Sequence, residues 1–558
     1  MEANREWAAA AEAAPNRSRV STPSSPLPIA SSSSAAPRRF SFFRPSHQHS
    51  ASSATVLLGG FALLSRLIGL IRDKYIAHTF GAGSGTDAYN VAFQLPDLIN
   101  YLLVGGAASI SFVTILSRYR ESGEHEAGDR ALSVILNTML LVLVAAVLVA
   151  EFAVPLYTHR FFPAGSEQAA LCTHMTRILL PGQIFFFAGG VLASVALVRK
   201  QFTYQGISPL VYTLGIILGG LLFARSIGIP SLAWGALAGS IAGPFLVNGY
   251  AARRAGVRYR PILDFADPGL RAWVRLSLPL MLGVTVVFMD NIILTWFAKH
   301  SVGDISRLMN AKRLFTAPMA IIGQAAGAAS LPFFASLYSR NLFADYASAV
   351  NRSVSRILAV AVVLSAAMFA LARPLVDLVY GGGAYHQTDI VITAVYFAVF
   401  TVSLPLWASQ AIYARAFYAA GETRLPMIWG TAITAASIPL YWGLHRWSLH
   451  HGSGVVGLAW ASNLAILAQT LMLATLAHRR SLVPLTGLNF AELLRSAAAA
   501  ALSYAAVYYV VRLLPAPPGH LGSVLLLLAG GAAWAVVVLA TLLVTGSDLL
   551  AQIRRRRA

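Results

Sequence analysis

Long apolar runs recur along nearly the whole chain and constrain its fold more than any other feature. Runs of about 20 residues, each long enough to cross roughly 30 Å of hydrocarbon as a helix, recur from residue 55 to residue 545. Hydrophobic residues make up 57% of the 558, and the mean hydropathy is +0.64. One soluble core cannot bury this much apolar surface, so the sequence predicts an all-α polytopic membrane protein.

The polar breaks between these runs predict fourteen transmembrane helices. The expected spans are 54–80, 86–118, 131–154, 171–198, 206–224, 231–252, 271–298, 304–338, 354–372, 388–419, 425–443, 454–477, 491–511 and 521–545. Because fourteen is even, both termini are expected on one side of the membrane. Outside the N-terminal tail, nineteen basic residues lie in loops on that side and six in the loops opposite. Cytoplasmic loops carry the excess of Lys and Arg, so this pattern predicts cytoplasmic termini and explains much of the formal charge of +20 without nucleic acid.

An internal repeat is visible within the sequence. The segment "GAASISFVTIL" at 106–116 returns as "GAASLPFFASL" at 327–337, an offset of 221. The tripeptide "LAW" at 232–234 returns at 458–460, an offset of 226. Two matches at nearly one spacing predict two copies of a six-helix unit that insert with the same orientation. Such an arrangement is typical of transporters whose two lobes rock about a substrate site between them.

The repeat, the apolar runs and the composition of the two ends divide the chain into five parts. The expected parts are a disordered cytoplasmic tail rich in Ser, Pro, Ala and Arg at 1–53, an N-lobe of helices 1–6 at 54–253, a C-lobe of helices 7–12 at 254–480, helices 13 and 14 at 481–548, and a basic cytoplasmic C-terminus at 549–558. The single cysteine, Cys172, excludes a disulfide within the chain and a multi-cysteine metal site. No HExxH or GxSxG motif occurs, so we expect neither an enzyme nor a bound metal.

Charged residues interrupt the first apolar segment, "SRLIGLIRDKYIAHTFGAGSGTDA". The five charges are Arg66, Arg72, Asp73, Lys74 and Asp87. An arginine that faces lipid at mid-depth costs about 3 kcal/mol or more, so we expect these side chains to face a polar interior. The alternative is that Arg72, Asp73 and Lys74 only mark a helix end or pair with one another.

The second lobe carries ionisable groups at corresponding places. They are Asp290 and Asn291 within an apolar span, and Lys312 and Arg313 in the next one. Pro96 and Pro318 are expected to bend or unwind the second helix of each lobe. Two interpretations of Asp290 stay open: a site for a coupling ion or proton, and a buried carboxylate that is hydrogen-bonded to a neighbouring helix.

Several longer motifs resemble a known family. The segment "SRLIGLIRDKYIAHTFGAGSGTDAYNVAFQLPDLINYLLVGGAASISFVTILSRY" is similar to the N-terminal signature of the MurJ/MviN family, the lipid II flippases of bacterial peptidoglycan synthesis. The likeness continues through "KQFTYQGISPLVYTLG", "NAKRLFTAPMAIIGQAAGAASLPFFASL" and "YARAFYAAGETRLPM". It covers roughly residues 54–545.

The resemblance implies a fourteen-helix fold of the multidrug/oligosaccharidyl-lipid/polysaccharide exporter superfamily. Two lobes would enclose a cationic cavity, and helices 13 and 14 would form a groove for the undecaprenyl tail. The family's binding residues carry over to Arg66, Arg72, Asp73, Asp87 and Arg313. Lys312, which we add to this set, stands where many members have Asp, and Asn100 and Tyr101 stand where many have a basic pair. Lys74 matches no motif of the family.

The implied activity is the outward flipping of lipid II by alternating access in the bacterial inner membrane. Its partners would be lipid II or a related polyprenyl-pyrophosphate glycolipid, membrane lipids and the cell-wall synthesis machinery. No cofactor is expected, and the membrane potential, with a coupling cation such as Na⁺ or H⁺, would drive transport. The alternatives are a flippase for another polyprenyl-linked oligosaccharide, a cation-coupled drug antiporter and a scaffold that transports nothing.

Overall fold

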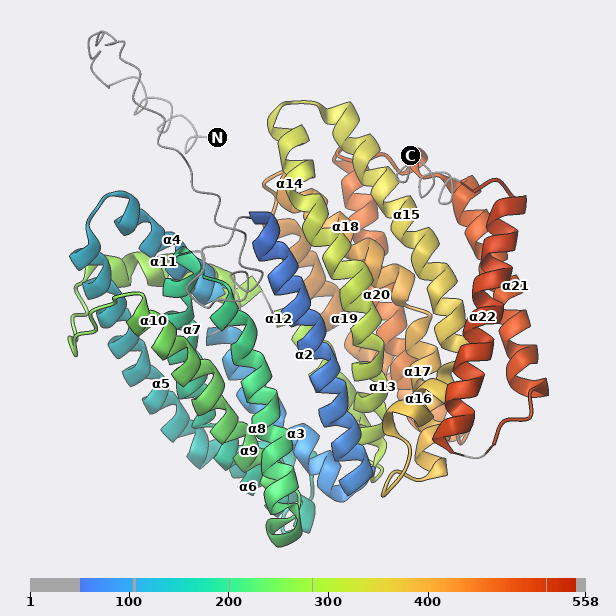
Figure 1. Ribbon diagram of the computed structural model, residues 1–558, viewed down its shortest axis with the longest axis horizontal. Coiled ribbons are helices and arrows are strands. Elements are labelled where there is room, and N and C mark those ends of the chain that lie inside the picture. The colour runs from blue at the N-terminus through green and yellow to red at the C-terminus, as the bar shows by residue number, and fades with distance from the viewer. Residues whose placement is uncertain (1–50, 104–106, 200, 284, 518, 548–558) are drawn as a thin grey trace, which may run out of the picture. The chain divides into compact units, whose positions relative to one another are not determined.

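Helices make up nearly all of the described chain, as the apolar runs predict (Figure 1). The computed structural model describes residues 51–103, 107–199, 201–283, 285–517 and 519–547. Within these ranges the extended pairing is limited to one isolated bridge between Gly382 and Tyr385. The predicted tail and the basic C-terminus lie outside the described residues, except that residues 51–53 already belong to the first helix.

The helices of the two predicted lobes follow the expected spans in order. Those of the N-lobe are α2 (Ala51–Phe80), α3 (Ser84–Leu103), α4 (Ala107–Glu121), α5 (His125–Phe161), α6 (Glu167–Leu179), α7 (Gly182–Val198), α8 (Thr203–Ile227), α9 (Pro230–Ser240), η1 (Ile241–Val247) and α10 (Asn248–Arg254). Those of the C-lobe are α11 (Pro268–Gly283), α12 (Thr285–Ala298), α13 (Asp304–Met319), η2 (Ala320–Gln324), α14 (Ala325–Ser339), α15 (Phe343–Ala370), α16 (Ala372–Tyr380), α17 (Gln387–Thr401), α18 (Leu404–Ala419), α19 (Arg424–His450) and α20 (Val456–Arg479).

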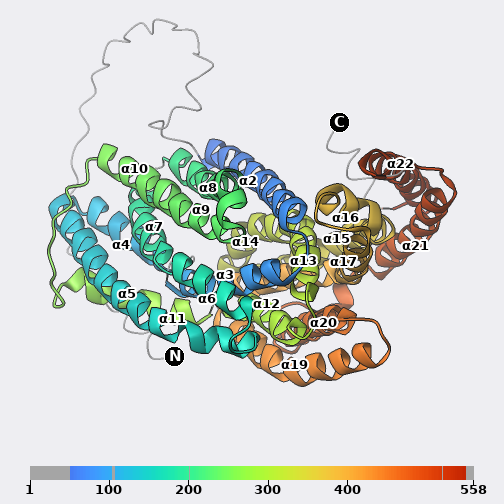
Figure 2. The same ribbon diagram turned by 90° about the horizontal axis from the view of Figure 1, so that it is seen from below.

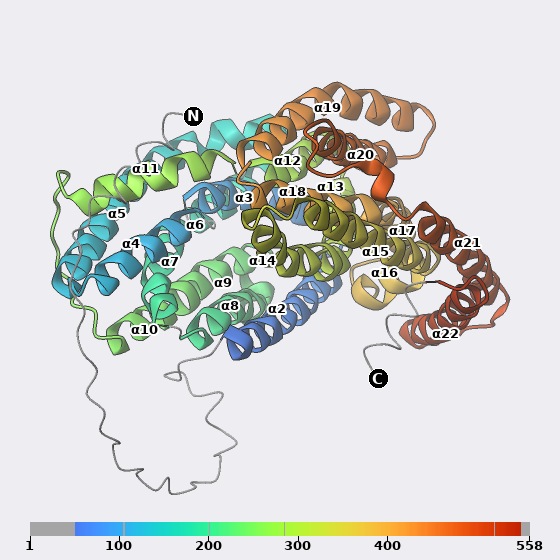
Figure 3. The same cartoon turned by 90° about the horizontal axis from the view of Figure 1, so that it is seen from above.

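Two further long helices end the described chain. After a short 3₁₀ turn, η3 (Leu485–Gly487), come α21 (Phe490–Leu513) and α22 (His520–Val544). They pack on each other and against α15 and α16 (Figure 3). The Ser523 hydroxyl donates to Asp377 on α16 over 2.5 Å, and the Trp534 indole donates to the Val363 carbonyl on α15 over 3.0 Å. The groove for a lipid tail beside these two helices stays a prediction.

The number of spans also stays a prediction. Among the described residues, eight helical segments are long and apolar enough to cross a membrane, and a ninth is the pair α17 and α18, which bends by 41°. Other expected spans hold more than one helix, such as 304–338, which holds α13 (16 residues), η2 and α14 (15 residues). Neither α13 nor α14 alone reaches the roughly 20 residues that a span needs, although the apolar segment as a whole is long enough.

The two predicted proline breaks have different outcomes. Pro318 lies near the end of α13 and is followed by the π-helical turn η2, so the helix changes its winding there as expected. Pro96 lies inside α3, which continues as a helix to Leu103, so the helix does not unwind there, and the alternative expectation of a bend stays a prediction. In a helical bundle, neighbouring helices and local adjustments accommodate the backbone groups that a proline frees.

The internal repeat reappears in the positions of the helices. From Ala107 on, the first copy of the "GAAS" segment lies in α4, and the second copy lies in α14; both helices are 15 residues long. Both "LAW" copies begin two residues after the start of a helix, α9 in one case and α20 in the other. Equivalent sequence therefore occupies equivalent places in two successive sets of helices.

Helix α2 lies where the two sets of helices meet. It packs along α8 on the N-lobe side and contacts α13 and α16 on the C-lobe side (Figure 2). Most residues of α2 are apolar, but it also carries the ion pair of Arg72 and Asp73. Both side chains line a cavity together with residues of α8 and α13. The charged part of α2 is thus positioned at the boundary between the lobes.

Glycines allow α8 and α9 to pack closely. A Cβ on Gly219 would lie 2.5 Å from the Cα of Gly235, and a Cβ on Gly215 would lie 2.6 Å from the Cα of Gly239. Small residues let transmembrane helices approach in this way. The α8–α9 contact fixes one wall of the site described below, because α8 also packs against α2.

We expect Gly219→Ala to lower the thermal unfolding temperature of the purified protein in detergent by at least several degrees, because the new methyl group meets backbone atoms that cannot yield. Gly443→Ala is the matched control, since its Cβ would have nothing within 4 Å and alanine favours a helix over glycine. Equal unfolding temperatures for the two variants would contradict the close packing.

Candidate functional site

A cavity of about 590 Å³ lies between α2, α8 and α13. Four of the six predicted binding residues line it: Arg66, Arg72, Asp73 and Arg313. Ser65 of α2, Gln205 and Thr213 of α8 and Thr316 of α13 complete its polar lining. Residues far apart in the sequence, from both predicted lobes, thus form one site.

Two of the arginines lie at a similar depth. Arg72 precedes the end of α2 by eight residues, or about 12 Å of helix. Arg313 follows the start of α13 by nine residues, or about 14 Å. Arg66 lies six residues further from that end of α2 than Arg72, about 9 Å away along the helix. The cavity therefore offers two levels of positive charge in the middle of the bundle.

The three arginines of the cavity differ in their hydrogen-bond partners. Arg72 donates from Nε and Nη2 to Oδ1 of Asp73 over 3.0 and 2.8 Å, so the pairing that the sequence offered as an alternative occurs for these two residues, and both line the cavity as expected. Arg313 donates from Nη2 to Oδ1 of Asn90 over 2.6 Å. Arg66 is exposed to the cavity and makes no hydrogen bond or ion pair with the described residues. Three guanidinium groups against one carboxylate give the cavity lining a net charge of +2.

Asp87 does not line this cavity, although the sequence predicts it as a binding residue. Its carboxylate is buried and accepts hydrogen bonds from the Gly303 N–H over 2.6 Å, the Ser306 N–H over 2.8 Å and the Ser306 hydroxyl over 2.6 Å. Gly303 immediately precedes α13 and Ser306 lies in its first turn, where unpaired N–H groups and the helix dipole attract an anion. Asp87 thus joins α3 of the N-lobe to the start of α13 in the C-lobe.

Other contacts between the lobes gather at the same end of the helices. We call this end, which carries the loops 81–83, 299–303 and 381–386, the closed end. The Ala384 N–H donates to the His78 carbonyl over 2.8 Å. The Lys74 ammonium, which no sequence motif explains, donates to the Leu378 carbonyl of α16 over 2.8 Å.

Lys299 makes a second link at the closed end. Its ammonium donates to the Arg160 carbonyl at the end of α5 over 2.5 Å and lies 3.6 Å from the ring centre of Trp296. Trp296 also meets Phe161 edge to face, with 5.4 Å between ring centroids. Burial and, to a smaller extent, the charge of Arg160 lower the pKa of Lys299 from its ordinary value. Two separate sets of side chains thus hold the lobes together at this end.

Lys312 is also absent from the cavity lining, because it pairs with Asp290. Its ammonium donates to Oδ2 of Asp290, and both side chains are at most 14% exposed. The Tyr441 hydroxyl donates to Oδ1 of Asp290, and the Ser462 hydroxyl donates to Oδ2 over 3.1 Å. Removal of one member of such a pair would leave an uncompensated charge in an apolar bundle, so each of the two groups depends on the other. The charge of Lys312 is thus balanced inside the C-lobe.

This pairing changes the interpretation of Asp290. Both of its oxygens already accept hydrogen bonds, so the buried, hydrogen-bonded carboxylate that the sequence left open is what the structure describes. A coupling ion at Asp290 would have to displace Lys312. Asn291 follows in α12, where its carbonyl accepts from the Thr295 hydroxyl over 2.9 Å. Asn100 is half-buried near the end of α3, and the side chain of Tyr101 lies outside the described residues.

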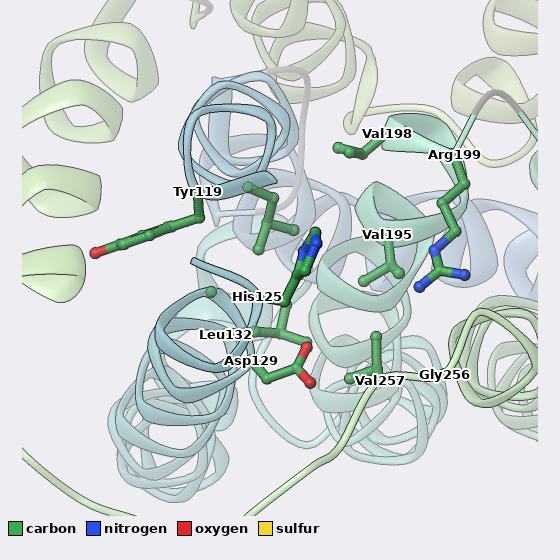
Figure 4. A pocket seen from close by; sticks show the side chains of 11 residues that line it. Tyr119, His125, Asp129, Leu132, Val195, Val198, Arg199, Gly256 and Val257 are labelled. Atoms are coloured by element: carbon green, nitrogen blue, oxygen red, sulfur yellow. The ribbon is translucent and has the colours of Figure 1, made fainter. Parts of the chain in front are cut away.

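A second cavity, of about 320 Å³, lies within the N-lobe between α4, α5 and α7 (Figure 4). Figure 4 shows His125, Asp129 and Arg199 around it. The Asp129 carboxylate accepts from the Arg258 N–H over 3.1 Å and so fixes the loop after α10 to α5. None of the residues predicted from the sequence lines this cavity.

Comparison with known proteins identifies the family. The family model described as lipid II flippase MurJ matches residues 76–530. The chain belongs to this family. A lipid II flippase MurJ of Burkholderia cenocepacia is 27% identical to it over 388 residues, which cover 67% of this chain and 74% of that protein.

Solved structures agree with the family in fold. The structure of a lipid II flippase MurJ in an inward closed conformation superposes with a TM-score of 0.73 at 21% identity, covering 86% of this chain and 98% of that one. The inward-facing structure of a multidrug resistance MATE family transporter of the MOP superfamily gives 0.61 at 14% identity, covering 76% and 98%. These matches confirm the predicted all-α transporter fold of the MurJ/MviN family.

Sequence reasoning missed part of the contact between the lobes. Asp87, Asn90 and Gln94 lie at spacings of three and four residues on α3, so they share one face of the helix. All three bond to the C-lobe: Asn90 to Ser306 and Arg313, and Gln94 to the Thr295 hydroxyl over 2.5 Å. A polar stripe on an otherwise apolar helix is the signal that could have found them.

The Lys312–Asp290 pair predicts a characteristic pattern of stability. Lys312→Met leaves a buried carboxylate without its counter-charge, and loss of one partner of a buried pair costs about 3–5 kcal/mol. Lys312→Met combined with Asp290→Asn removes both charges and should recover most of the loss. Thermal unfolding of the purified variants in detergent measures this, and a double variant as unstable as the single one would contradict the pairing.

Proposed function

We propose that this chain is a lipid II flippase that moves the undecaprenyl-pyrophosphate-linked peptidoglycan precursor from the cytoplasmic to the outer leaflet. The observation that carries the proposal is the cavity in which Arg66, Arg72 and Arg313 lie together with one carboxylate, Asp73. Membership of the lipid II flippase MurJ family supports the same cargo.

The charge of the cavity suits a pyrophosphate. A pyrophosphate diester carries two negative charges, and the lining carries a net charge of +2. Guanidinium groups bind phosphate oxygens through paired N–H donors, which a lysine cannot do. Arg66 has no partner among the described residues, so it is ready to bind without first breaking a contact.

The contacts between the lobes at the closed end agree with a transport cycle of alternating access, in which one end is closed while the other is open. We propose that it faces the outside of the cell, in accordance with the excess of basic residues in the loops of the opposite side. The headgroup would then reach the cavity from the cytoplasmic leaflet. Rocking of the lobes would release the closed-end contacts and expose the headgroup outside, while the lipid tail stays in hydrocarbon.

The alternatives fit the cavity to different degrees. A cation-coupled drug antiporter should have an acidic cavity for cationic substrates, whereas three arginines face one aspartate here. A flippase for another polyprenyl-linked oligosaccharide would use the same arginines, because its cargo shares the pyrophosphate. A scaffold that transports nothing would not need the arginines at all. The complementation experiment below separates these possibilities.

The energy source belongs to the same proposal. An anionic headgroup that moves outward from a negative cytoplasm gains about 2.3 kcal/mol per charge per 100 mV. We propose that the membrane potential drives transport without a bound cofactor, in the bacterial inner membrane and with both termini in the cytoplasm. A coupling cation such as Na⁺ or H⁺ at Asp290 is a secondary proposal, since Lys312 would have to leave its partner. Contact with the cell-wall synthesis machinery is proposed from the cargo alone.

Complementation tests the cargo and the arginines together. The parent chain is expected to restore growth and outward exposure of lipid II in a strain depleted of its own lipid II flippase. Arg66→Ala and Arg313→Ala should each fail or lower the flipping rate by about tenfold or more, because each loses charge-assisted contacts with the pyrophosphate. Growth and binding of a probe for exposed lipid II are the measurements.

Arg225→Ala is the matched control, since Arg225 is an exposed arginine outside the cavity. It should complement like the parent. A parent that reaches the membrane but does not expose lipid II would exclude this cargo. Alanine variants that work as well as the parent would exclude the pyrophosphate contact.

The membrane potential gives an independent test in proteoliposomes. A potential that is negative on the cytoplasmic side, set by a potassium gradient with valinomycin, should raise the fraction of lipid II in the opposite leaflet. The exposed fraction can be measured with a soluble hydrolase that cuts only accessible headgroups. A fraction that does not respond to the sign of the potential would show that no net charge moves with the cargo.

A further inference from the structure

A chain of hydrogen bonds connects the cavity with the closed end through Asn90. This side chain is 6% exposed. Its Oδ1 accepts from the Arg313 guanidinium over 2.6 Å. Its Nδ2 donates to the Ser306 hydroxyl over 3.3 Å and to the Thr86 carbonyl over 2.8 Å. One amide thus contacts both an arginine of the cavity and the first turn of α13.

The chain continues to Asp87. The Ser306 hydroxyl that accepts from Asn90 donates to the Asp87 carboxylate over 2.6 Å, and Asp87 also accepts from the Gly303 N–H. Arg313, Ser306 and Gly303 belong to α13 or the loop before it, whereas Asn90 and Asp87 belong to α3. Each step from Arg313 to Gly303 therefore crosses the boundary between the lobes.

Asparagine suits this position because it offers an acceptor and a donor together. The guanidinium of Arg313 can only donate, and the Thr86 carbonyl can only accept, so the two partners fix the orientation of the amide. An aspartate would present acceptors on both sides and would lie near the Asp87 carboxylate. An alanine would leave Arg313 and Ser306 without this link.

We propose that Asn90 is a positioning residue that couples cargo binding at Arg313 to the opening of the closed end. The proposal rests on the proposed function, because it takes the cargo to be a polyprenyl pyrophosphate. When phosphate oxygens bind the Arg313 guanidinium, Oδ1 of Asn90 loses its charged donor. The amide then no longer holds Ser306 in place beside Asp87, and the contact between α3 and the start of α13 weakens. Occupied and empty cavities therefore differ in how firmly the closed end is held.

Gln94 provides a matched control. It lies on the same face of α3, and its Nε2 donates across the lobe boundary to the Thr295 hydroxyl over 2.5 Å. Among the described residues it makes no hydrogen bond with Arg313 or Ser306. Gln94→Ala therefore removes one hydrogen bond between the lobes and leaves the chain from Arg313 to Asp87 intact.

The experiment measures the distance across the closed end with and without lipid II. Spin labels are attached at Ser84→Cys and Val302→Cys, two exposed positions on opposite lobes, in a Cys172→Ala background. Pulsed electron paramagnetic resonance in nanodiscs gives the distance distribution, and lipid II binding is measured on the same samples. In the parent chain, which keeps Asn90, and in the Gln94→Ala control, lipid II should shift the distance distribution toward longer distances. With Asn90→Ala, binding should stay within about threefold, and the distribution should be the same with and without lipid II.

Asn90→Asp gives a second variant of nearly unchanged size. Its carboxylate should hold Arg313 in a permanent ion pair and weaken lipid II binding by about tenfold. A lipid II response in Asn90→Ala equal to that of the parent would overturn the coupling role and leave the proposed function standing. A parent chain that neither binds lipid II nor responds to it would overturn the proposed function, and the coupling role with it.

Discussion

Charges inside an apolar bundle need partners, and helix α13 shows how this protein meets that constraint. Three cations project from this one helix toward different neighbours. Arg307 bonds to Asp389 on α17 over 2.8 Å, Lys312 to Asp290 on α12, and Arg313 to Asn90 on α3. Carboxylates within the C-lobe balance Arg307 and Lys312, and Arg307 also bonds to Asp304 over 3.1 Å. The third partner is an uncharged amide on the other lobe, so Arg313 keeps its full charge for the cavity.

The start of α13 also binds a carboxylate of the N-lobe. Its first N–H groups and the Ser306 hydroxyl bind the Asp87 carboxylate of α3, which makes a helix terminus part of the contact between the lobes. A single helix thus carries a cavity arginine and one half of the closed-end contact. Any movement of α13 relative to α3 changes both, and this shared helix is the physical reason for expecting cargo and closed end to be linked.

The sequence predicts the parts of this architecture that depend on pattern along the chain. Apolar runs predict the helices, the repeat predicts their duplication, and the cost of charge in lipid predicts that Arg66, Arg72 and Arg313 face one interior. Lateral contacts are harder to predict. The pairing of Lys312 with Asp290 depends on how α12 and α13 pack, and nothing in their spacing indicates it. Asp87 was expected beside the cargo, whereas its neighbours place it at the closed end.

We propose that the cavity between α2, α8 and α13 holds the pyrophosphate of a polyprenyl-linked precursor. An experimental structure of this protein with lipid II bound in nanodiscs tests it most directly. We expect phosphate oxygens about 2.7–2.9 Å from guanidinium nitrogens of Arg313 and of at least one of Arg66 and Arg72. A pyrophosphate bound outside this cavity, with the three arginines unchanged from the structure described above, would contradict the account.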